Sequence, residues 1–198
     1  ALELGLIKRK IKKKDYKKFQ NEMQGFSEII EIVLNEQSGF VRNIARDTSH
    51  VKHWFFLGCG VYYPVAMESA LKMKEVTYQH AEGMPAGFLK HGTLSMVEPA
   101  LHTLFFVPPP EQKELHKRTL IAMEQVKSRG GTVIAIIFQG DELAQKLAFQ
   151  SIKLPVVSSL LAPLLQMIIA QMFAYYAALN LGRNIDKPRN LAKSVTVG

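Results

Sequence analysis

The residues best suited to acid–base chemistry lie on a predicted helix over residues 61–78. Glu68, Lys72 and Glu75 are four and three positions apart, so one face of that helix carries all three. A carboxylate can abstract a proton from a carbon next to a carbonyl, and a lysine can activate the carbonyl as a Schiff base. The same spacing also fits a structural ladder of ion pairs on a solvent-facing helix. The residues alone leave both interpretations open.

Two histidines follow this helix in the segment HAEGMPAGFLKHG. His80 and His91 carry the side chain whose ordinary pKa lies nearest neutrality, as a proton shuttle for ring opening requires. Three glycines and an acid make the segment too polar for a core element, so we expect an exposed loop that can belong to an active site. Either histidine can equally cap a helix, pair with a neighbour or face water.

The spacing of residues does not support several other chemistries. His80 and Glu82 are too close for a helical chelate, and His91 has no partner at ligand spacing, so no zinc site is expected. The sequence lacks the nucleophile elbow of serine hydrolases. The turn Gly58-Cys59-Gly60 lacks a third glycine and any hydroxyl or lysine for a phosphate. It therefore predicts a tight strand-to-helix turn and no nucleotide site.

Alternating apolar runs and helical periods indicate the elements that position these residues. From residue 52 onward, the runs HWFFLG, TLFFVP, TVIAIIF and SIKLPVV predict strands, each followed by Gly, Pro or Ser. Helical periods follow at 61–78, 111–129, 141–148 and 160–181. Strand followed by helix, repeated, predicts an α/β fold with a parallel sheet and flanking helices. The first fifty residues show only helical spacing and predict a helical N-terminal segment.

Composition limits the class of protein. With 198 residues, 47% of them hydrophobic, the chain can form one core. The single cysteine, Cys59, excludes an intrachain disulfide framework and fits a reducing cytoplasm. Residues 1–18 supply +6 of the net charge of +8, so this basic run predicts a solvated helix or linker in preference to a nucleic-acid surface. Leu160–Leu181 is interrupted by Gln166 and Gln171, which favours a buried helix over a membrane span.

Three segments resemble one known family. ESALKMKEVTYQHAEGMPAGFLKHG, the preceding LGCGVYYP and the terminal DKPRNLAKSVTV are similar to the second sugar isomerase (SIS) half of the glutamine:fructose-6-phosphate amidotransferase family, the glucosamine-6-phosphate synthases. The resemblance implies a flavodoxin-like SIS domain over residues 51–183. It also implies a helical linker, or the end of a preceding SIS half, over residues 1–50 and a catalytic C-terminal tail over residues 184–198.

The family pattern implies roles for individual residues. Glu75 matches the base that moves a proton between C1 and C2, and Lys72 matches the lysine that assists it. His91 matches the histidine that opens the sugar ring in the active site of the neighbouring subunit, which implies a homodimer. Lys193 matches the lysine that forms an imine with the C2 carbonyl, and Ala192 beside it is expected to contact the substrate. The resemblance implies no metal and no organic cofactor.

The activity implied by the resemblance is conversion of fructose 6-phosphate and glutamine to glucosamine 6-phosphate and glutamate in the cytoplasm. The chain contains neither the glutaminase nor the first SIS half with its phosphate-binding loops, so we expect a C-terminal piece that is inactive alone. The alternative is a noncatalytic SIS module that binds a sugar phosphate and regulates a partner. A deaminating or deglycating relative is disfavoured by the tail PRNLAKSVTV. Departures from the family pattern at Cys59, Phe88 and Thr93 touch none of the four matched residues.

Overall fold

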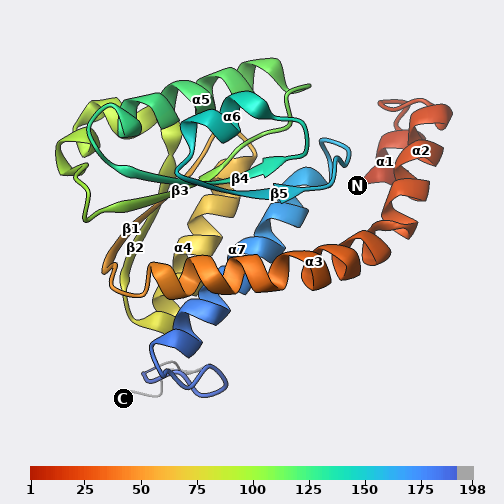
Figure 1. Ribbon diagram of the computed structural model, residues 1–198. Coiled ribbons are helices and arrows are strands. Elements are labelled where there is room, and N and C mark those ends of the chain that lie inside the picture. Colours follow the sequence, from red (N-terminus) through yellow and green to blue (C-terminus); the bar gives the residue numbers. More distant parts are fainter. Residues whose placement is uncertain (191–198) are drawn as a thin grey trace, which may run out of the picture.

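The computed structural model describes residues 1–190 and contains a sheet of five parallel strands in the order β2-β1-β3-β4-β5 (Figure 1). The strands are β1 (His53–Gly58), β2 (His80–Pro85), β3 (His102–Phe106), β4 (Thr132–Phe138) and β5 (Gln150–Leu154). Because β1 pairs with β2 on one side and β3 on the other, the chain winds in both directions, as in flavodoxin-like sheets. The predicted α/β class and parallel sheet are confirmed.

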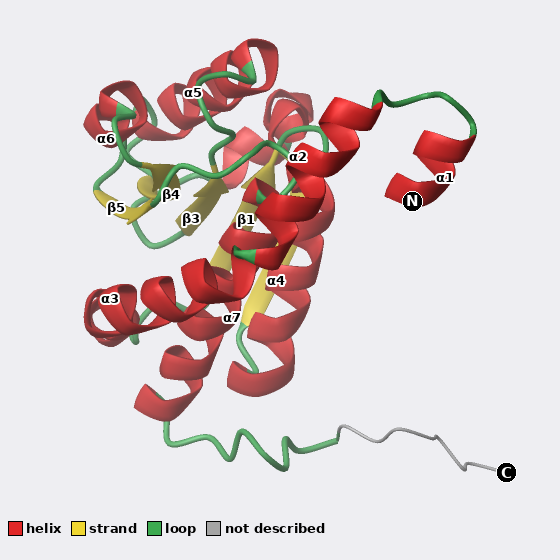
Figure 2. Ribbon diagram, turned by 90° about the vertical axis from the view of Figure 1, so that its right-hand side faces the viewer, coloured by secondary structure: helices red, strands yellow, loops and turns green. Residues whose placement is uncertain are grey.

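Helices cover both faces of the sheet (Figures 1 and 2). One layer consists of α3 (Phe26–Asp47), α4 (Tyr62–Thr77) and α7 (Ala162–Asn180), and the other of α5 (Lys113–Lys127), α6 (Glu142–Leu147) and the 3-10 helices η1 (Ala86–His91) and η2 (Thr93–Met96). Along β1, Trp54 and Phe56 pack under the first layer, and Phe55 and Leu57 under the second. Burial on both faces explains why the central strands are continuous apolar runs in the sequence.

The first fifty residues form helices and no strand, as expected. α1 (Leu2–Ile7) and α2 (Lys13–Gln24) bury no residue and lie to one side of the sheet, at the right of Figure 1. The basic run therefore lies in the turn between these two helices and on the first half of α2. Only α3 joins the core, where its buried residues are Val33, Val41, Ile44 and Ala45.

The apolar helix α7 is a core helix, as predicted. It is long and apolar enough to cross a membrane by length and composition, but half of its most apolar window is buried inside the protein. Its side chains Leu165, Ile169 and Phe173 are fully buried in the layer that it shares with α3 and α4. The buried Gln166 amide donates to the carbonyls of Val107 and Ile136 at 2.8 and 3.1 Å. This polar residue thus connects the helix to the strand ends.

The expectation of a loop directly after α4 is wrong for residues 80–85, which form the edge strand β2. β2 pairs with β1 in parallel register, from His53 opposite His80 to Gly58 opposite Pro85. The strand is hard to recognise because it buries only Ala81 and Met84, one on each face, and because Gly83 replaces a larger side chain against α4. A Cβ at Gly83 would lie 2.5 Å from Cα of Met67, so α4 packs directly against the strand backbone.

Candidate active site

The exposed face of α4 carries three side chains joined by ion pairs. Lys72 Nζ donates to Glu75 Oε2 at 2.6 Å and lies 3.5 Å from Glu68 Oε1. The helical spacing brings the three to one face, as predicted from the sequence. Glu75 is the less exposed carboxylate, with 21% of its side chain accessible against 41% for Glu68. Exposed ion pairs of this kind add little to the stability of the fold. The position of the three side chains in the fold is therefore the better guide to their function.

Lys72 is held in its charged form. The hydrogen bond to Glu75 raises the pKa of Lys72 above its ordinary value, and the negative charges of Glu75 and Glu68 act in the same direction. Burial acts the opposite way and is outweighed. Lys72 is therefore a cation at neutral pH. A cation at this place stabilises negative charge on a neighbouring carboxylate or on a substrate bound beside it.

The last turn of α4 and the segment after α7 lie at the same end of the sheet. α4 follows the end of β1 and precedes the start of β2, so Glu75 lies near the N-terminal ends of the strands. α7 ends at Asn180, and beyond it the backbone N–H of Arg189 donates to the Tyr78 hydroxyl at 2.8 Å. The chain after α7 lies below the sheet in Figure 1. Lys193 and Ala192, the remaining predicted site residues, lie outside the described residues.

His91 lies at the opposite end of the sheet from Glu75. It is the last residue of η1, which follows the C-terminal end of β2, and its exposed ring lies edge-on to that of Phe88 with centroids 5.9 Å apart. At about 3.3 Å per residue, β2 alone separates the two ends by roughly 16 Å. A single chain therefore does not bring His91 and Glu75 together. The two can share a site only when they come from different copies of the chain.

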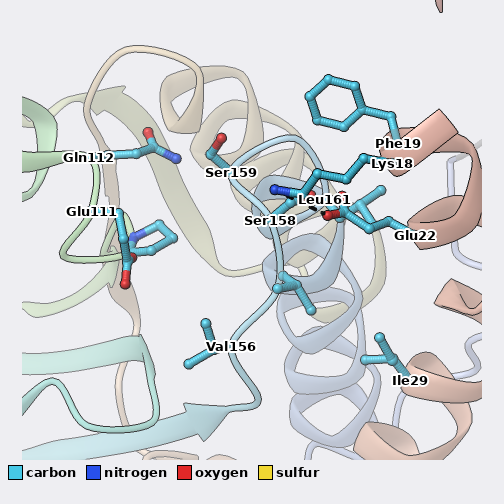
Figure 3. A pocket seen from close by; sticks show the side chains of 12 residues that line it. Lys18, Phe19, Glu22, Ile29, Glu111, Gln112, Val156, Ser158, Ser159 and Leu161 are labelled. Carbon is cyan, nitrogen blue, oxygen red and sulfur yellow. Dashed lines mark ion pairs between the residues drawn. The ribbon is translucent and has the colours of Figure 1, made fainter. Parts of the chain in front are cut away.

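A cleft of about 570 Å³ opens beside the loops that follow β3 and β5 (Figure 3). This end of a doubly wound sheet is the usual place for a ligand. Ser158 and Ser159 line the cleft together with Lys18 and Glu22, whose charged groups are 3.9 Å apart and offset each other. Glu111 adds a further negative charge. The lining therefore does not favour an anionic ligand, and it includes neither Glu75, Lys72 nor His91.

The turn after β1 is tight, as the sequence predicted. A Cβ at Gly58 would collide with the Tyr62 carbonyl, and Gly60 has φ +56°. A second cleft, of about 480 Å³, borders this turn and is also lined by Lys90 and Arg118. The sequence does not indicate that these two cations are neighbours, because they come from η1 and α5, which are distant in sequence. The sequence analysis missed Tyr78, since its contact with Arg189 spans 111 positions.

Other titratable groups have structural explanations. His116 Nε2 lies 2.8 Å from Asp141 Oδ2 in a buried pair, and Asp141 Oδ1 accepts from the Ala144 N–H at the start of α6. The rings of His53 and His80 lie side by side on β1 and β2, with centroids 5.6 Å apart. Residues 1–190 contain no group of three or more His, Cys, Asp or Glu side chains that could hold a metal ion.

Comparison with known proteins identifies relatives over most of the chain. The SIS domain family is matched over residues 49–181. Glutamine–fructose-6-phosphate aminotransferase [isomerizing] of Thermus thermophilus is 41% identical over 176 residues, which are 89% of this chain and 28% of that protein. The enzyme of the same name from Buchnera aphidicola is 41% identical over 168 residues, 85% of this chain and 27% of that protein. This chain thus spans less than a third of these relatives.

A solved structure shares the fold over nearly the whole chain. The C-terminal domain of glucosamine-fructose-6-phosphate aminotransferase from Francisella tularensis superposes with a TM-score of 0.85 at 29% sequence identity. The match covers 94% of this chain and 52% of that one. Both the sequence and the structural relatives therefore extend well beyond the residues compared.

Proposed function

Because this chain belongs to the SIS domain family and is homologous to the C-terminal isomerase domain of glutamine–fructose-6-phosphate aminotransferases, we propose that it isomerises the sugar in the synthesis of glucosamine 6-phosphate. We call the longer protein that would contain it, with a glutaminase and a first SIS domain, the complete enzyme. Residues 51–183 are then the SIS domain, residues 1–50 the linker and residues 184–198 the catalytic tail. The observation that carries the proposal is the Lys72–Glu75 pair at the sheet end that the C-terminal segment also reaches.

Glu75 is the proposed base. After ammonia from glutamine has displaced Lys193 from its imine with the open-chain sugar, the C2 imine carries the nitrogen of the product. The Glu75 carboxylate then takes a proton from C1 and returns it to C2, while the proton of the C1 hydroxyl passes to the nitrogen, which gives the amino aldose. Lys72, a cation 2.6 Å from this carboxylate, assists by stabilising the negative charge that develops as the proton moves.

Lys193 is the proposed imine-forming lysine, and Ala192 beside it is the proposed substrate contact. The bond between Arg189 and Tyr78 supports a place near Glu75, because Tyr78 follows Glu75 by three residues and Lys193 follows Arg189 by four. Four residues of extended chain span at most about 14 Å. The tail can therefore reach the last turn of α4 from its attachment at Arg189.

His91 is the proposed ring-opening group, and it acts in the site of a neighbouring subunit. The separation of His91 from Glu75 across the length of β2 supports this arrangement. The exposure of the His91 ring leaves it accessible to a second chain. The complete enzyme is accordingly a homodimer, and the lone, buried Cys59 fits a location in the reducing cytoplasm.

Replacing Glu75 with Gln in the complete enzyme tests the proposal. The amide keeps the shape of the side chain but cannot accept a proton, so glucosamine 6-phosphate formation should fall at least about a hundredfold. Glutamine hydrolysis, which this domain does not perform, should persist. Glu68→Gln alters the other carboxylate that pairs with Lys72 and should leave turnover within about twofold. If the Glu75→Gln enzyme made glucosamine 6-phosphate at the parent rate, then Glu68, Lys72 and Glu75 would form only a structural set of ion pairs on the surface of α4.

A further inference from the structure

Tyr78, which follows α4 directly, has a backbone conformation that its residue type disfavours. Its φ of 64° and ψ of 18° lie in the left-handed region, while its N–H donates to the Lys74 carbonyl at 3.1 Å. Glycine usually occupies this position after a helix, because a Cβ is crowded there. The need to end the helix would favour glycine here, so it does not explain why the residue is a tyrosine. Disfavoured backbone conformations of this kind are often retained where the side chain has a task.

The side chain of Tyr78 makes three contacts with the segment after α7. Its hydroxyl accepts the hydrogen bond from the Arg189 N–H at 2.8 Å. The guanidinium carbon of Arg189 lies 4.4 Å from the ring centroid, and that of Arg183 lies 5.1 Å from it. Both distances are within the range of cation–π attraction. One aromatic ring thus interacts with two cations and one backbone amide of the same segment.

Residues 181–183 continue from α7 through backbone hydrogen bonds such as that from the Arg183 N–H to the Ala178 carbonyl at 2.9 Å, but within residues 1–190 no other polar contact connects residues 184–190 to the SIS fold. Neither arginine forms an ion pair there. The hydrogen bond from the Lys187 N–H to the Asn184 side chain is internal to the segment. Tyr78 is therefore the described polar attachment of residues 184–190 to the end of α4.

We propose that Tyr78 is a positioning residue that fastens the C-terminal tail to the end of α4 and so holds Lys193 within reach of the sugar that Glu75 deprotonates. The inference rests on the proposed function. Tyr78 lies one helical turn beyond Glu75, and its partner Arg189 lies four residues before Lys193, so one contact limits how far the imine-forming lysine can lie from the base. Tyr78 itself touches neither proton nor imine.

Hydrogen exchange in the full 198-residue chain tests the attachment without reference to activity. Tyr78→Phe removes the acceptor oxygen and keeps the ring, so the Arg189 amide should exchange about fivefold faster by NMR. Tyr78→Gly removes all three contacts and suits the left-handed backbone, so exchange at Arg189 should rise about tenfold or more. Amides of the sheet should exchange as in the parent chain. Unchanged exchange at Arg189 in Tyr78→Gly would overturn the attachment.

A matched control exists on α3. The guanidinium of Arg42 lies 5.0 Å from the centroid of the Tyr176 ring, in a cation–π pair outside the proposed site. Arg42→Gln should leave both the exchange of Arg189 and the turnover of the complete enzyme unchanged. Arg189→Gln should accelerate exchange in residues 184–190 and lower turnover. If Arg42→Gln and Arg189→Gln changed amide exchange and turnover by the same factor, loss of either cation–π pair would have the same consequence. That result would contradict a specific role for Tyr78.

Kinetics of the complete enzyme separate positioning from structure. Tyr78→Gly should lower kcat for glucosamine 6-phosphate at least about tenfold, and slow borohydride trapping of fructose 6-phosphate on Lys193, with glutamine hydrolysis unchanged. Tyr78→Phe should recover most of the trapping rate. One outcome is that the Glu75→Gln enzyme is inactive, whereas the Tyr78→Gly enzyme is labelled by borohydride at the parent rate and makes glucosamine 6-phosphate at the parent rate. The proposed function then stands and the positioning role of Tyr78 fails. If Glu75→Gln is fully active, the proposed function fails, and the positioning role fails with it.

Discussion

Three local features surround Glu75, the proposed base. Its side chain is a carboxylate, it has a cationic neighbour 2.6 Å away, and it is partly shielded at the end of a helix. The cationic neighbour is a property of local sequence, because helical spacing brings Lys72 to Glu75 wherever the helix lies. The place of Glu75 in the fold is not local, because α4 returns the chain to the N-terminal end of the sheet, where Tyr78 contacts Arg189. The residue and its partner could thus be predicted, whereas the attachment through Tyr78 could not.

Lys193 provides the residue-scale prediction with the clearest chemical readout. Lys193→Arg keeps the positive charge but cannot form an imine, so it separates covalent chemistry from electrostatics. In the complete enzyme, borohydride reduction with fructose 6-phosphate should attach the sugar to Lys193 in the parent, and leave the arginine variant unlabelled and inactive. Mass spectrometry of the digested protein locates the label. A label on another lysine, or near-normal turnover by the variant, would leave the tail a covering or structural element.

At the scale of elements, α4 and β2 form the unit that positions the site. Their backbones approach so closely that Gly83 faces Met67 with no room for a side chain. The sequence predicted β1, β3 and β4 because these strands are buried runs of apolar residues. β5 is an edge strand with only Ile152 and Leu154 buried, and it was predicted from the apolar run SIKLPVV that overlaps it. β2 was not predicted, because His80 and Glu82 face solvent and interrupt any such run. The pairing with β1 and the packing of α4 are tertiary effects, and these decide the conformation of residues 80–85.

Gly83→Ala should therefore destabilise the chain. The added methyl group would lie within 2.7 Å of backbone atoms of α4, so the helix or the strand must shift, at a cost of about 1–3 kcal/mol in the free energy of unfolding. Urea denaturation followed by circular dichroism measures this change. Gly87→Ala, whose new methyl group meets nothing within 4 Å, is the matched control and should change stability by less than about 0.5 kcal/mol. Equal stabilities for the two variants would argue against close packing of α4 on β2.

At the scale of the whole molecule, the chain carries its proposed catalytic residues at two ends of one sheet. Glu75, Lys72 and the C-terminal segment share the N-terminal ends of the strands, whereas His91 follows their C-terminal ends. A symmetric dimer places the same surfaces of two chains in contact and can bring one end of each into a shared site. In the proposed homodimer, each chain would supply Glu75 and Lys72 to one site and His91 to the other.

The isolated chain should therefore bind sugar phosphate poorly. Phosphate groups supply much of the recognition of small sugar phosphates. The cleft beside the loops after β3 and β5 has a lining of mixed charge, and neither this cleft nor the one lined by Lys90 and Arg118 includes Glu75, Lys72 or His91. Isothermal titration calorimetry with fructose 6-phosphate should give no measurable heat. Tight, stoichiometric binding would instead favour the alternative of a self-sufficient sugar-phosphate module that regulates a partner.

Complementation between two inactive variants tests the central claim most directly, namely that Glu75 works in one site with His91 of the neighbouring subunit. Glu75→Gln and His91→Asn variants of the complete enzyme should each lose synthase activity. When they are co-expressed and mix at random, half of the dimers contain one chain of each kind, and one of the two sites in such a dimer has both native residues. Activity should then recover to roughly a quarter of that of the parent enzyme. No recovery in verified mixed dimers would place Glu75 and His91 in the same chain's site and contradict the account.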